Sequence, residues 1–254
     1  MSNQVACSVK DLVLSINKDK LILDNVSFEI TKGSLTCLTG ANGAGKSLLM
    51  RSIKGLLKID SGSIFVDQKD LTQKSKKRNL EIGLVFQDAD TQIVGQTVKQ
   101  DLLFGLQNLQ LEADEQQRRV DYVTSLLNIE DLLDKRPRAL SGGEKRKVAI
   151  GGVLVMKPKI VMLDEPFANL DFSGVVQVLK GLLKLKEEGI TTLIATHEIE
   201  KVLYHCDSII ILDKGKVGYK GDVVSSLPLL EDFGIRRPIV GNTPLDISEL
   251  TWLK

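Results

Sequence analysis

The sequence has few cysteines and aromatic residues, and its charges nearly cancel. The three cysteines are an odd number without the spacing of a metal site. We therefore expect small core residues in a reducing compartment, and neither a disulfide framework nor a cysteine-bound metal. With 34 Lys and Arg against 33 Asp and Glu, the formal net charge is +1, which gives no bulk reason to expect nucleic acid as a partner.

Long hydrophobic runs are also missing. The longest apolar stretches, such as VAIGGVLVM over 148–156, fall short of the about 20 residues that a membrane-spanning helix needs. The polar start MSNQVACSVKD is not typical of a secretory signal. We expect a chain that does not span a membrane by itself.

What the sequence does contain is an alternation of strand-like and helix-like segments. It predicts an α/β fold with a mostly parallel sheet. The first 30 residues favour a small antiparallel layer, and a helix-rich insert is expected over about 95–158. The strand-like runs are 11–16, 21–30, 34–40, 63–67, 82–86, 159–164, 191–196 and 208–213, and the helix-like patterns are 46–57, 142–156 and 175–189.

The strongest motif is GANGAGKS at 40–47, which follows an apolar strand and opens a helix. It matches G-x-x-x-x-G-K-[ST], a phosphate-binding loop whose backbone N–H groups surround phosphates at a helix N-terminus. Lys46 can reach the β- and γ-phosphates, and Ser47 offers its hydroxyl to Mg²⁺. Nucleotide binding is therefore expected, with these residues forming the loop: Gly40, Ala41, Asn42, Gly43, Ala44, Gly45, Lys46 and Ser47.

Two carboxylates end the apolar run IVMLDE at 160–165. Asp164 suits Mg²⁺ coordination, and Glu165, one residue past the strand, can polarise a water for attack on a γ-phosphate. Alone, such a strand end is usually only solvated. Beside a phosphate loop, the catalytic interpretation is favoured.

A second anion site is expected in LSGGEKRK at 140–147, where Ser141, Gly142 and Gly143 begin a helix with free N–H groups and a hydroxyl. The alternative is an ordinary helix N-cap. Because the motif lies in the helical insert, it need not face the chain's own phosphate loop. Two copies arranged head to tail would bring it to the partner's γ-phosphate.

Together, GANGAGKS, Gln87, LSGGEKRK, LDE, ANLD at 168–171 and His197 resemble the nucleotide-binding domain of ABC ATPases. The resemblance implies a P-loop NTPase (RecA-like) parallel-sheet core with an N-terminal antiparallel β-subdomain and an inserted α-helical subdomain. It implies one domain over 5–228 and a short C-terminal extension over 229–254. It also implies that two ATP molecules with Mg²⁺ are sandwiched between two such domains.

The same resemblance implies a role for each matching residue. Gln87 would contact Mg²⁺ and the attacking water, and Ser141 with the two glycines would bind the opposing γ-phosphate. Asp171 would link the two sites across the dimer, and His197 would contact the γ-phosphate. Glu165, His197 and Gln87 are thus the expected catalytic residues, and Ser47, Gln87 and Asp164 the expected Mg²⁺ ligands.

The sequence departs from the family pattern at two places. The stretch LSINKDK at 14–20 lacks the aromatic residue that stacks on adenine, so Ile16 or a neighbour is expected to give only apolar contact. Glu144 stands where Gln is commonest, which should be tolerated because the preceding groups make the anion contacts.

The stretch VFQDADTQIVGQTVKQDLLFGLQNLQL at 85–111 most resembles the cobalt/nickel and energy-coupling-factor (ECF) importer ATPases. The resemblance implies a peripheral subunit on the cytoplasmic face of the membrane, paired with a second ATPase subunit. An integral membrane coupling protein would dock near Gln87–Val98 and work with a substrate-binding membrane component that imports a vitamin or a transition-metal ion. The alternatives are a soluble ABC ATPase in DNA repair or translation, and the ATPase of an exporter. The matching positions are Gln92, Thr97, Val98, Asp101, Phe104, Gly105, Asn108 and Leu109.

Overall fold

The computed structural model describes residues 4–17, 20–107, 109–240, 243–244 and 246–253. Its centre is a six-stranded sheet in the order β10-β9-β3-β8-β7-β6. All neighbours in it are parallel except β9 and β10. Asn108, which matched the importer pattern, lies outside the described residues. The strands are β3 (Leu35–Thr39), β6 (Ile82–Val85), β7 (Ile160–Asp164), β8 (Thr191–Ala195), β9 (Ser208–Asp213) and β10 (Lys216–Gly221).

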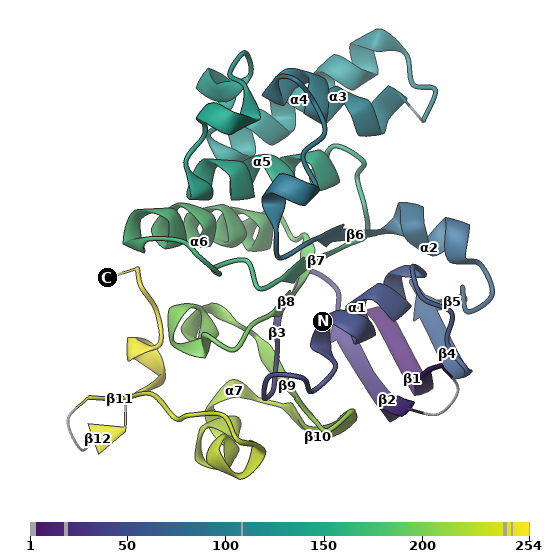
Figure 1. Cartoon of the computed structure of the whole chain (residues 1–254), viewed down its shortest axis with the longest axis vertical. Helices are drawn as coiled ribbons and strands as arrows, with labels where there is room; N and C mark the ends of the chain where they lie inside the picture. Colours follow the sequence, from purple (N-terminus) through teal and green to yellow (C-terminus); the bar gives the residue numbers. More distant parts are fainter. Residues whose placement is uncertain (1–3, 18–19, 108, 241–242, 245, 254) are drawn as a thin grey trace.

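A separate antiparallel sheet contains the first strands of the chain, in the order β2-β1-β4-β5. It lies beside α1 (Lys46–Lys54) and the edge of the central sheet (Figure 1). A third sheet pairs two short strands near the C-terminus, β11 (Ile239–Val240) and β12 (Thr243–Pro244). The antiparallel strands are β1 (Val5–Ile16), β2 (Lys20–Thr31), β4 (Ser61–Val66) and β5 (Lys69–Asp70).

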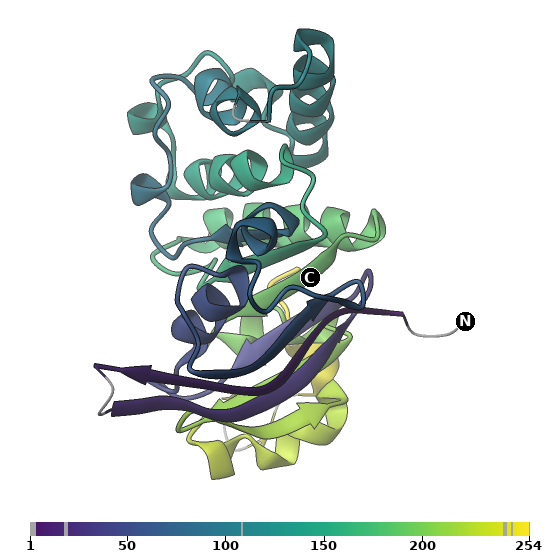
Figure 2. The same cartoon turned by 90° about the vertical axis from the view of Figure 1, so that its right-hand side faces the viewer.

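Between β6 and β7 the described residues form helices and no strand. These helices gather at one end of the molecule, beyond α6, in both views (Figures 1 and 2). The remaining helices are α2 (Ser75–Glu81), α3 (Val98–Gln107), α4 (Ala113–Leu127), α5 (Gly142–Leu154), α6 (Phe172–Glu187) and α7 (Val223–Ser226). Short 3₁₀ turns occupy Ala89–Thr91, Glu130–Leu132, Pro137–Ala139, Ile199–Lys201, Leu203–His205, Leu227–Leu229, Glu231–Phe233 and Ile247–Glu249.

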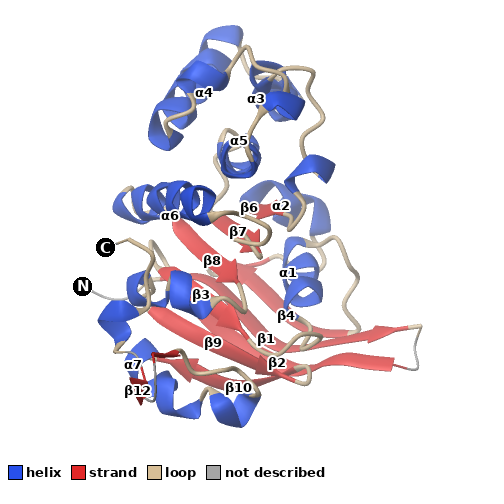
Figure 3. Cartoon of the chain, turned by 60° about the vertical axis from the view of Figure 1, so that its left-hand side comes forward, coloured by secondary structure: helices blue, strands red, loops and turns tan. Residues whose placement is uncertain are grey.

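The central sheet is covered on both faces, which explains its uninterrupted apolar strands. In β7, Val161 and Leu163 pack toward the core formed with α5 and α6. The alternating residues Ile160 and Met162 pack toward α1 and the antiparallel sheet. Figure 3 shows this layering of helices and strands. The α/β fold with a parallel core, an antiparallel β-layer and a helical insert is therefore confirmed, whereas the exact limits of the domain stay a prediction.

Some boundaries differ from the sequence patterns. The helix expected over 46–57 ends at Lys54, because Gly55 adopts a left-handed conformation and caps it. The helix expected from 175 begins at Phe172, because the Asp171 side chain accepts a hydrogen bond from Gly174 N and caps it. In the part of the chain that the structure describes, no helix combines the length and apolar character needed to cross a membrane.

Candidate functional site

The phosphate loop connects β3 to α1 and needs glycine at its entrance. Gly40 has φ of 149°, and a Cβ there would lie 2.1 Å from the Leu212 carbonyl oxygen. Gly45, directly before α1, has φ of 105°. No residue with a side chain fits these positions without strain, so the loop stays close to the sheet edge and the first N–H groups of α1 stay open.

Lys46 is the cation of this loop. Its side chain is buried, and Nζ donates to the carbonyl oxygens of Gly40 at 2.8 Å and Ala41 at 3.4 Å. Burial lowers the pKa of Lys46, while the nearby carboxylates of Glu165 and Asp164 oppose that shift. The ammonium group is thus held over the loop by backbone oxygens, where a phosphate oxygen would replace them as its partner.

Ser47 and Asp164 form an oxygen-rich pair at the start of α1 and the end of β7. Ser47 Oγ donates to Asp164 Oδ1 at 3.0 Å. Burial raises the pKa of Asp164, the hydrogen bond from Ser47 lowers it, and the charge of Glu165 raises it further. A hydroxyl and a buried carboxylate are hard oxygen donors of the kind that Mg²⁺ prefers, so the expected ligands fit the ion.

Glu165 and His197 are in direct contact. Glu165 follows β7 with φ of 45°, an uncommon conformation for a residue other than glycine. Its Oε1 lies 2.9 Å from His197 Nδ1, and its Oε2 accepts from the His197 backbone N–H at 3.4 Å. Glu165 is 8% exposed. Separate roles were expected for these two residues, and in the structure their side chains form one hydrogen-bonded unit.

Gln87 lies near Ser47 and Asp164. It is exposed and lines a pocket of about 600 Å³ that these two residues share. The pocket also reaches Leu56 and Phe86, away from the phosphate loop. The three expected Mg²⁺ ligands, Ser47, Asp164 and Gln87, thus line one pocket, and the role of Gln87 in it stays a prediction.

Arg146 is a residue of this region that the sequence reasoning missed. From α5, its Nη1 donates to Phe86 O at 2.7 Å and its Nη2 to Gln87 O at 2.6 Å. Arg146 is 4% exposed, and burial lowers its pKa. One guanidinium thus ties the backbone of Gln87 to the helix that begins at Ser141. An arginine within the buried stretch of α5 was the available signal.

Ser141 begins α5 with a complete capping box. Ser141 Oγ accepts from Glu144 N at 3.3 Å, and the Glu144 carboxylate accepts from Ser141 N at 2.7 Å. The interpretation as a helix N-cap is therefore correct at the level of the single chain. Glu144, which departs from the family pattern, accepts one of the two hydrogen bonds of this capping box through its carboxylate.

Gly143 brings α5 against the start of α6. A Cβ at Gly143 would lie 2.8 Å from Gly174 Cα. Asp171 caps α6 through its 2.8 Å bond from Gly174 N. The expected anion-binding residues Ser141–Gly143 and the expected inter-site residue Asp171 therefore lie at one helix–helix contact.

The expected site residues thus fall into two groups. Residues 40–47, Asp164, Glu165 and His197 gather at the ends of β3, β7 and β8, with Gln87 beside them. Ser141–Gly143 and Asp171 form the second group. Among the residues that the structure describes, no hydrogen bond or ion pair joins the second group to the phosphate loop.

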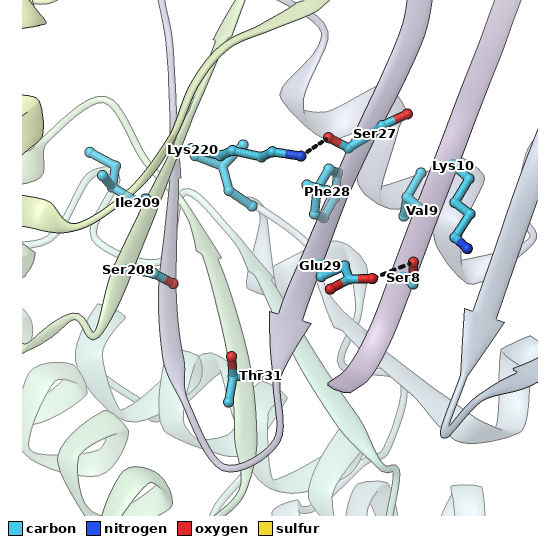
Figure 4. A pocket seen from close by; sticks show the side chains of 12 residues that line it. Ser8, Val9, Lys10, Ser27, Phe28, Glu29, Thr31, Ser208, Ile209 and Lys220 are labelled. Atoms are coloured by element: carbon cyan, nitrogen blue, oxygen red, sulfur yellow. Dashed lines mark hydrogen bonds between the residues drawn. The ribbon is translucent and has the colours of Figure 1, made fainter. Parts of the chain in front are cut away.

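Another pocket, of about 410 Å³, lies between β1, β2, β9 and β10 and contains none of these residues (Figure 4). Several of its polar side chains make hydrogen bonds within the protein. Ser8 Oγ donates to Glu29 Oε1 at 3.3 Å, and Lys220 Nζ donates to Ser27 O at 3.2 Å. Its chemistry does not suggest a second catalytic centre.

Comparisons with known proteins agree with this geometry. The ABC transporter family model matches residues 23–168. The energy-coupling factor transporter ATP-binding protein EcfA3 of Clostridium perfringens is 38% identical over 241 residues, which are 92% of this chain and 85% of the relative. EcfA1 of Bacillus subtilis, with the same description, is 40% identical over 220 residues, or 85% of this chain and 78% of the relative.

Solved structures give the same result. The structure of cbiO1 from Clostridium perfringens, described as part of the ABC transporter complex cbiONQ, matches with a TM-score of 0.83 and 37% identity. The match covers 92% of this chain and 96% of that one. A nucleotide-free ATP-binding cassette from an ABC transporter matches with a TM-score of 0.81 and 26% identity over 91% of this chain and 97% of that one. The chain therefore belongs to the ABC transporter family of ATP-binding proteins.

Proposed function

We propose that this chain is the ATP-hydrolysing, energy-coupling subunit of an ECF-type importer, bound peripherally to the cytoplasmic face of a membrane. The observation that carries the proposal is the segment after Gln87, which connects the catalytic site to an exposed surface. Identities of 35–40% to proteins named as energy-coupling factor ATP-binding subunits support it. The exporter alternative is weaker, because the matching Atm1-family exporter is 25% identical.

The phosphate loop would hold the substrate ATP. Backbone N–H groups of residues 40–47 bind its phosphates, and Lys46 exchanges its carbonyl partners for phosphate oxygens. Ser47, Asp164 and Gln87 would hold Mg²⁺, which neutralises charge on the β- and γ-phosphates when bound. Among the described residues, no group of three or more His, Cys, Asp or Glu side chains could hold a metal ion. In such sites phosphate oxygens of the nucleotide also bind the ion.

Glu165 would orient and deprotonate the attacking water. Its carboxylate is buried and fixed by His197 at 2.9 Å, which leaves little freedom for it to turn away. The water oxygen attacks the γ-phosphorus in line, its proton passes toward Glu165, and ADP leaves with phosphate as the second product. The His197 side chain is about half exposed, so it can also contact the γ-phosphate.

The second group of residues would act on the ATP of a second ATPase subunit, identical or closely related. Ser141 and the first N–H groups of α5 form an anion-binding helix start with the positive end of the helix dipole. Since they make no bond to the phosphate loop of their own chain, a head-to-tail pair would supply their ligand. Asp171, exposed at the start of α6, would lie at the contact between the two subunits.

The docking surface for a membrane coupling protein would be the Gln87–Val98 segment. The side chains in and next to this segment are of two kinds, some hydrogen-bonded to the loop backbone and others exposed. Gln92 Oε1 accepts from Phe86 N at 2.9 Å, and Asp101 Oδ1 accepts from Val94 N at 2.8 Å and Gly95 N at 3.0 Å. These side chains therefore shape the loop from inside, whereas Val94 is 63% exposed and available for contact.

A pocket of about 760 Å³ adjoins this surface, lined by Asp90, Ile93, Gly95, Gln96, Arg136, Pro137 and Arg138. It joins the segment after Gln87 to the turn before Ser141. A partner bound here would contact both segments. Movements of either group of site residues could therefore be transmitted to it. The imported substrate, a vitamin or a transition-metal ion, would be bound by a separate membrane component and would not touch this chain. No nucleic acid is expected as a partner.

The proposal is tested by affinity capture of the full chain from gently solubilised membranes. We expect integral membrane proteins to be recovered, including one that binds the imported substrate. Val94→Asp should reduce their recovery while ATP hydrolysis by the chain persists, and Leu80→Asp, at an exposed position of α2, should leave recovery unchanged. Recovery of only ribosomal or DNA-repair proteins would refute the importer assignment.

A further inference from the structure

The C-terminal end of the chain folds back onto the segment that follows His197. Leu250 is fully buried, and its carbonyl oxygen accepts from Tyr204 N at 3.1 Å. Thr251 Oγ1 lies 2.6 Å from His205 Nε2. Figures 1 and 3 show the chain end beside α6. The extension is therefore a packed part of the molecule at this point.

Trp252 sits where three elements meet. Its ring stacks on Phe172 with centroids 5.6 Å apart and an interplanar angle of 28°. On another side, Lys201 Nζ lies 4.7 Å from the Trp252 centroid and 6.0 Å from the Phe167 centroid. Lys201 is 5% exposed and pairs with Glu198. A buried cation thus lies against two aromatic rings, and such cation–π contacts are favourable.

Each contact of this cluster follows a site residue closely in sequence. Phe167 lies two residues after Glu165, Phe172 directly after Asp171, and Lys201 four residues after His197. Glu165 and His197 touch each other across two separate loops. Their placement starts from the pairing of β7 with β8, in which Glu165 N donates to Ala195 O at 2.8 Å. Beyond the strands, Lys201 lies against the rings of Phe167 and Trp252 and so links the segments that follow Glu165 and His197.

We propose that Trp252 is a positioning residue for ATP hydrolysis: through Lys201 and Phe172 it sets the loops that carry Glu165, His197 and Asp171 relative to one another. The proposal concerns hydrolysis alone and does not depend on the imported substrate or the membrane partner. Phe172 is 65% exposed, so the stacked pair adds less to core packing than a buried pair would. Loss of the Trp252–Phe172 pair should therefore lower the rate of ATP hydrolysis more than the free energy of unfolding.

The first test compares Trp252→Ala with Trp252→Phe in the full chain. Since a misplacement of about 1 Å can cost about 100-fold in rate, we expect Trp252→Ala to lower kcat about tenfold, with KM and nucleotide affinity near wild type. Trp252→Phe, which can still stack, should restore most of kcat. Val224→Ala, at an exposed position of α7, is the matched control for loss of an exposed apolar side chain.

The second test replaces the charged Lys201 side chain with an uncharged one of similar size. Lys201→Met should reproduce the loss in kcat, and Phe172→Leu should do so more weakly. These variants also keep the proposal testable if Trp252→Ala does not fold. A Trp252→Ala enzyme with wild-type kcat, measured well below its melting temperature, would overturn the proposal. So would a Trp252→Phe enzyme as slow as Trp252→Ala.

Trp252 is the single tryptophan of the sequence, so its fluorescence reports directly on this cluster. In the Glu165→Gln background, where hydrolysis should not intervene, we expect Mg²⁺ with ATP to change its emission, and Lys46→Ala to abolish the change. Emission that is the same with and without Mg²⁺ and ATP, under conditions where nucleotide binding is measured independently, would contradict the coupling.

Discussion

At the scale of single residues, the account depends on the pairing of Glu165 with His197. The positive φ of Glu165 turns its carboxylate from the end of β7 toward the loop after β8. Glu165→Gln should keep ATP binding and lose turnover by about 100- to 10,000-fold, the usual contribution of a positioned base. Steady-state phosphate release and equilibrium nucleotide binding measure the two effects. Near-normal hydrolysis would remove Glu165 from its role.

Asp164 gives a prediction for stability without nucleotide. Its folded pKa is raised, mainly by burial, so the folded chain holds this proton to a higher pH than the unfolded chain. Stability contributed by the protonated form is therefore lost as pH rises through the folded pKa, and the ionised carboxylate destabilises the fold at neutral pH. Asp164→Asn should raise Tm at neutral pH, by about 2–4 °C per kcal/mol relieved.

The gain from Asp164→Asn should shrink as pH falls toward the region where the wild-type carboxyl is protonated in both states. Thermal melts of both proteins over a pH series measure it. A gain that is equal at all pH values would show that the charge of Asp164 is not its cause. Mg²⁺-dependent ATP binding should weaken in the same variant.

Ile16 gives a prediction for base selectivity. It is 41% exposed at the end of β1 and lies in the stretch 14–20, which lacks the aromatic residue of the family pattern. Positions 18–19 of that stretch lie outside the described residues. A stacking ring contributes about 1–3 kcal/mol per base. Ile16→Tyr should therefore lower KM for ATP at least fivefold with kcat little changed. Ile16→Leu is the control, and an unchanged KM would place the base elsewhere.

The motif residues were predictable because their chemistry needs fixed residue types at fixed spacing. Gly40 to Ser47 and Asp164 are of this kind. Arg146 was not predictable, because its two carbonyl acceptors lie about sixty positions earlier in the sequence. The bond between Glu165 and His197 likewise needs β7 and β8 to be neighbours in the sheet, which the spacing of the two residues does not reveal.

At the scale of elements, the contact between α5 and α6 decides where Ser141 stands. Gly143→Ala would place a Cβ 2.8 Å from Gly174 Cα, closer than packing allows, and overpacking costs about 1–3 kcal/mol. We expect a lower Tm and reduced hydrolysis, measured by thermal melts and phosphate release. Gly181→Ala, whose Cβ would meet Leu127 at an ordinary 3.4 Å, should be neutral or stabilising. Equal effects of the two changes would contradict this account.

The strands were predictable as elements because both faces of the central sheet are buried, which makes their sequences continuously apolar. Strand β10 was not, because its residues are mostly exposed and its place depends on pairing with β9. The separation of α3 and α4 within the insert was not resolved either. Their amphipathic faces meet α5, and only the packed structure shows which residues turn inward.

At the scale of the whole molecule, the expected ATP site falls into two groups, and no hydrogen bond or ion pair between them occurs in the part of the chain that the structure describes. The sequence suggested this division, since the second anion motif lies in the helical insert. The packing of the C-terminal extension was not foreseeable, because its prolines and weak periodicity gave no pattern. The same division yields the most direct test of the account.

The decisive measurement is ATP hydrolysis by a mixture of two inactive variants of the full chain. Lys46→Ala disables the phosphate loop, and Ser141→Ala disables the second group. If two copies complete each other's sites, a mixed pair contains one site with both defects and one intact site. We predict that mixing restores hydrolysis well above the sum of the two variants alone. If the mixture is no more active than that sum, the two groups do not complete each other across two copies of this chain, and pairing of the chain with itself is refuted.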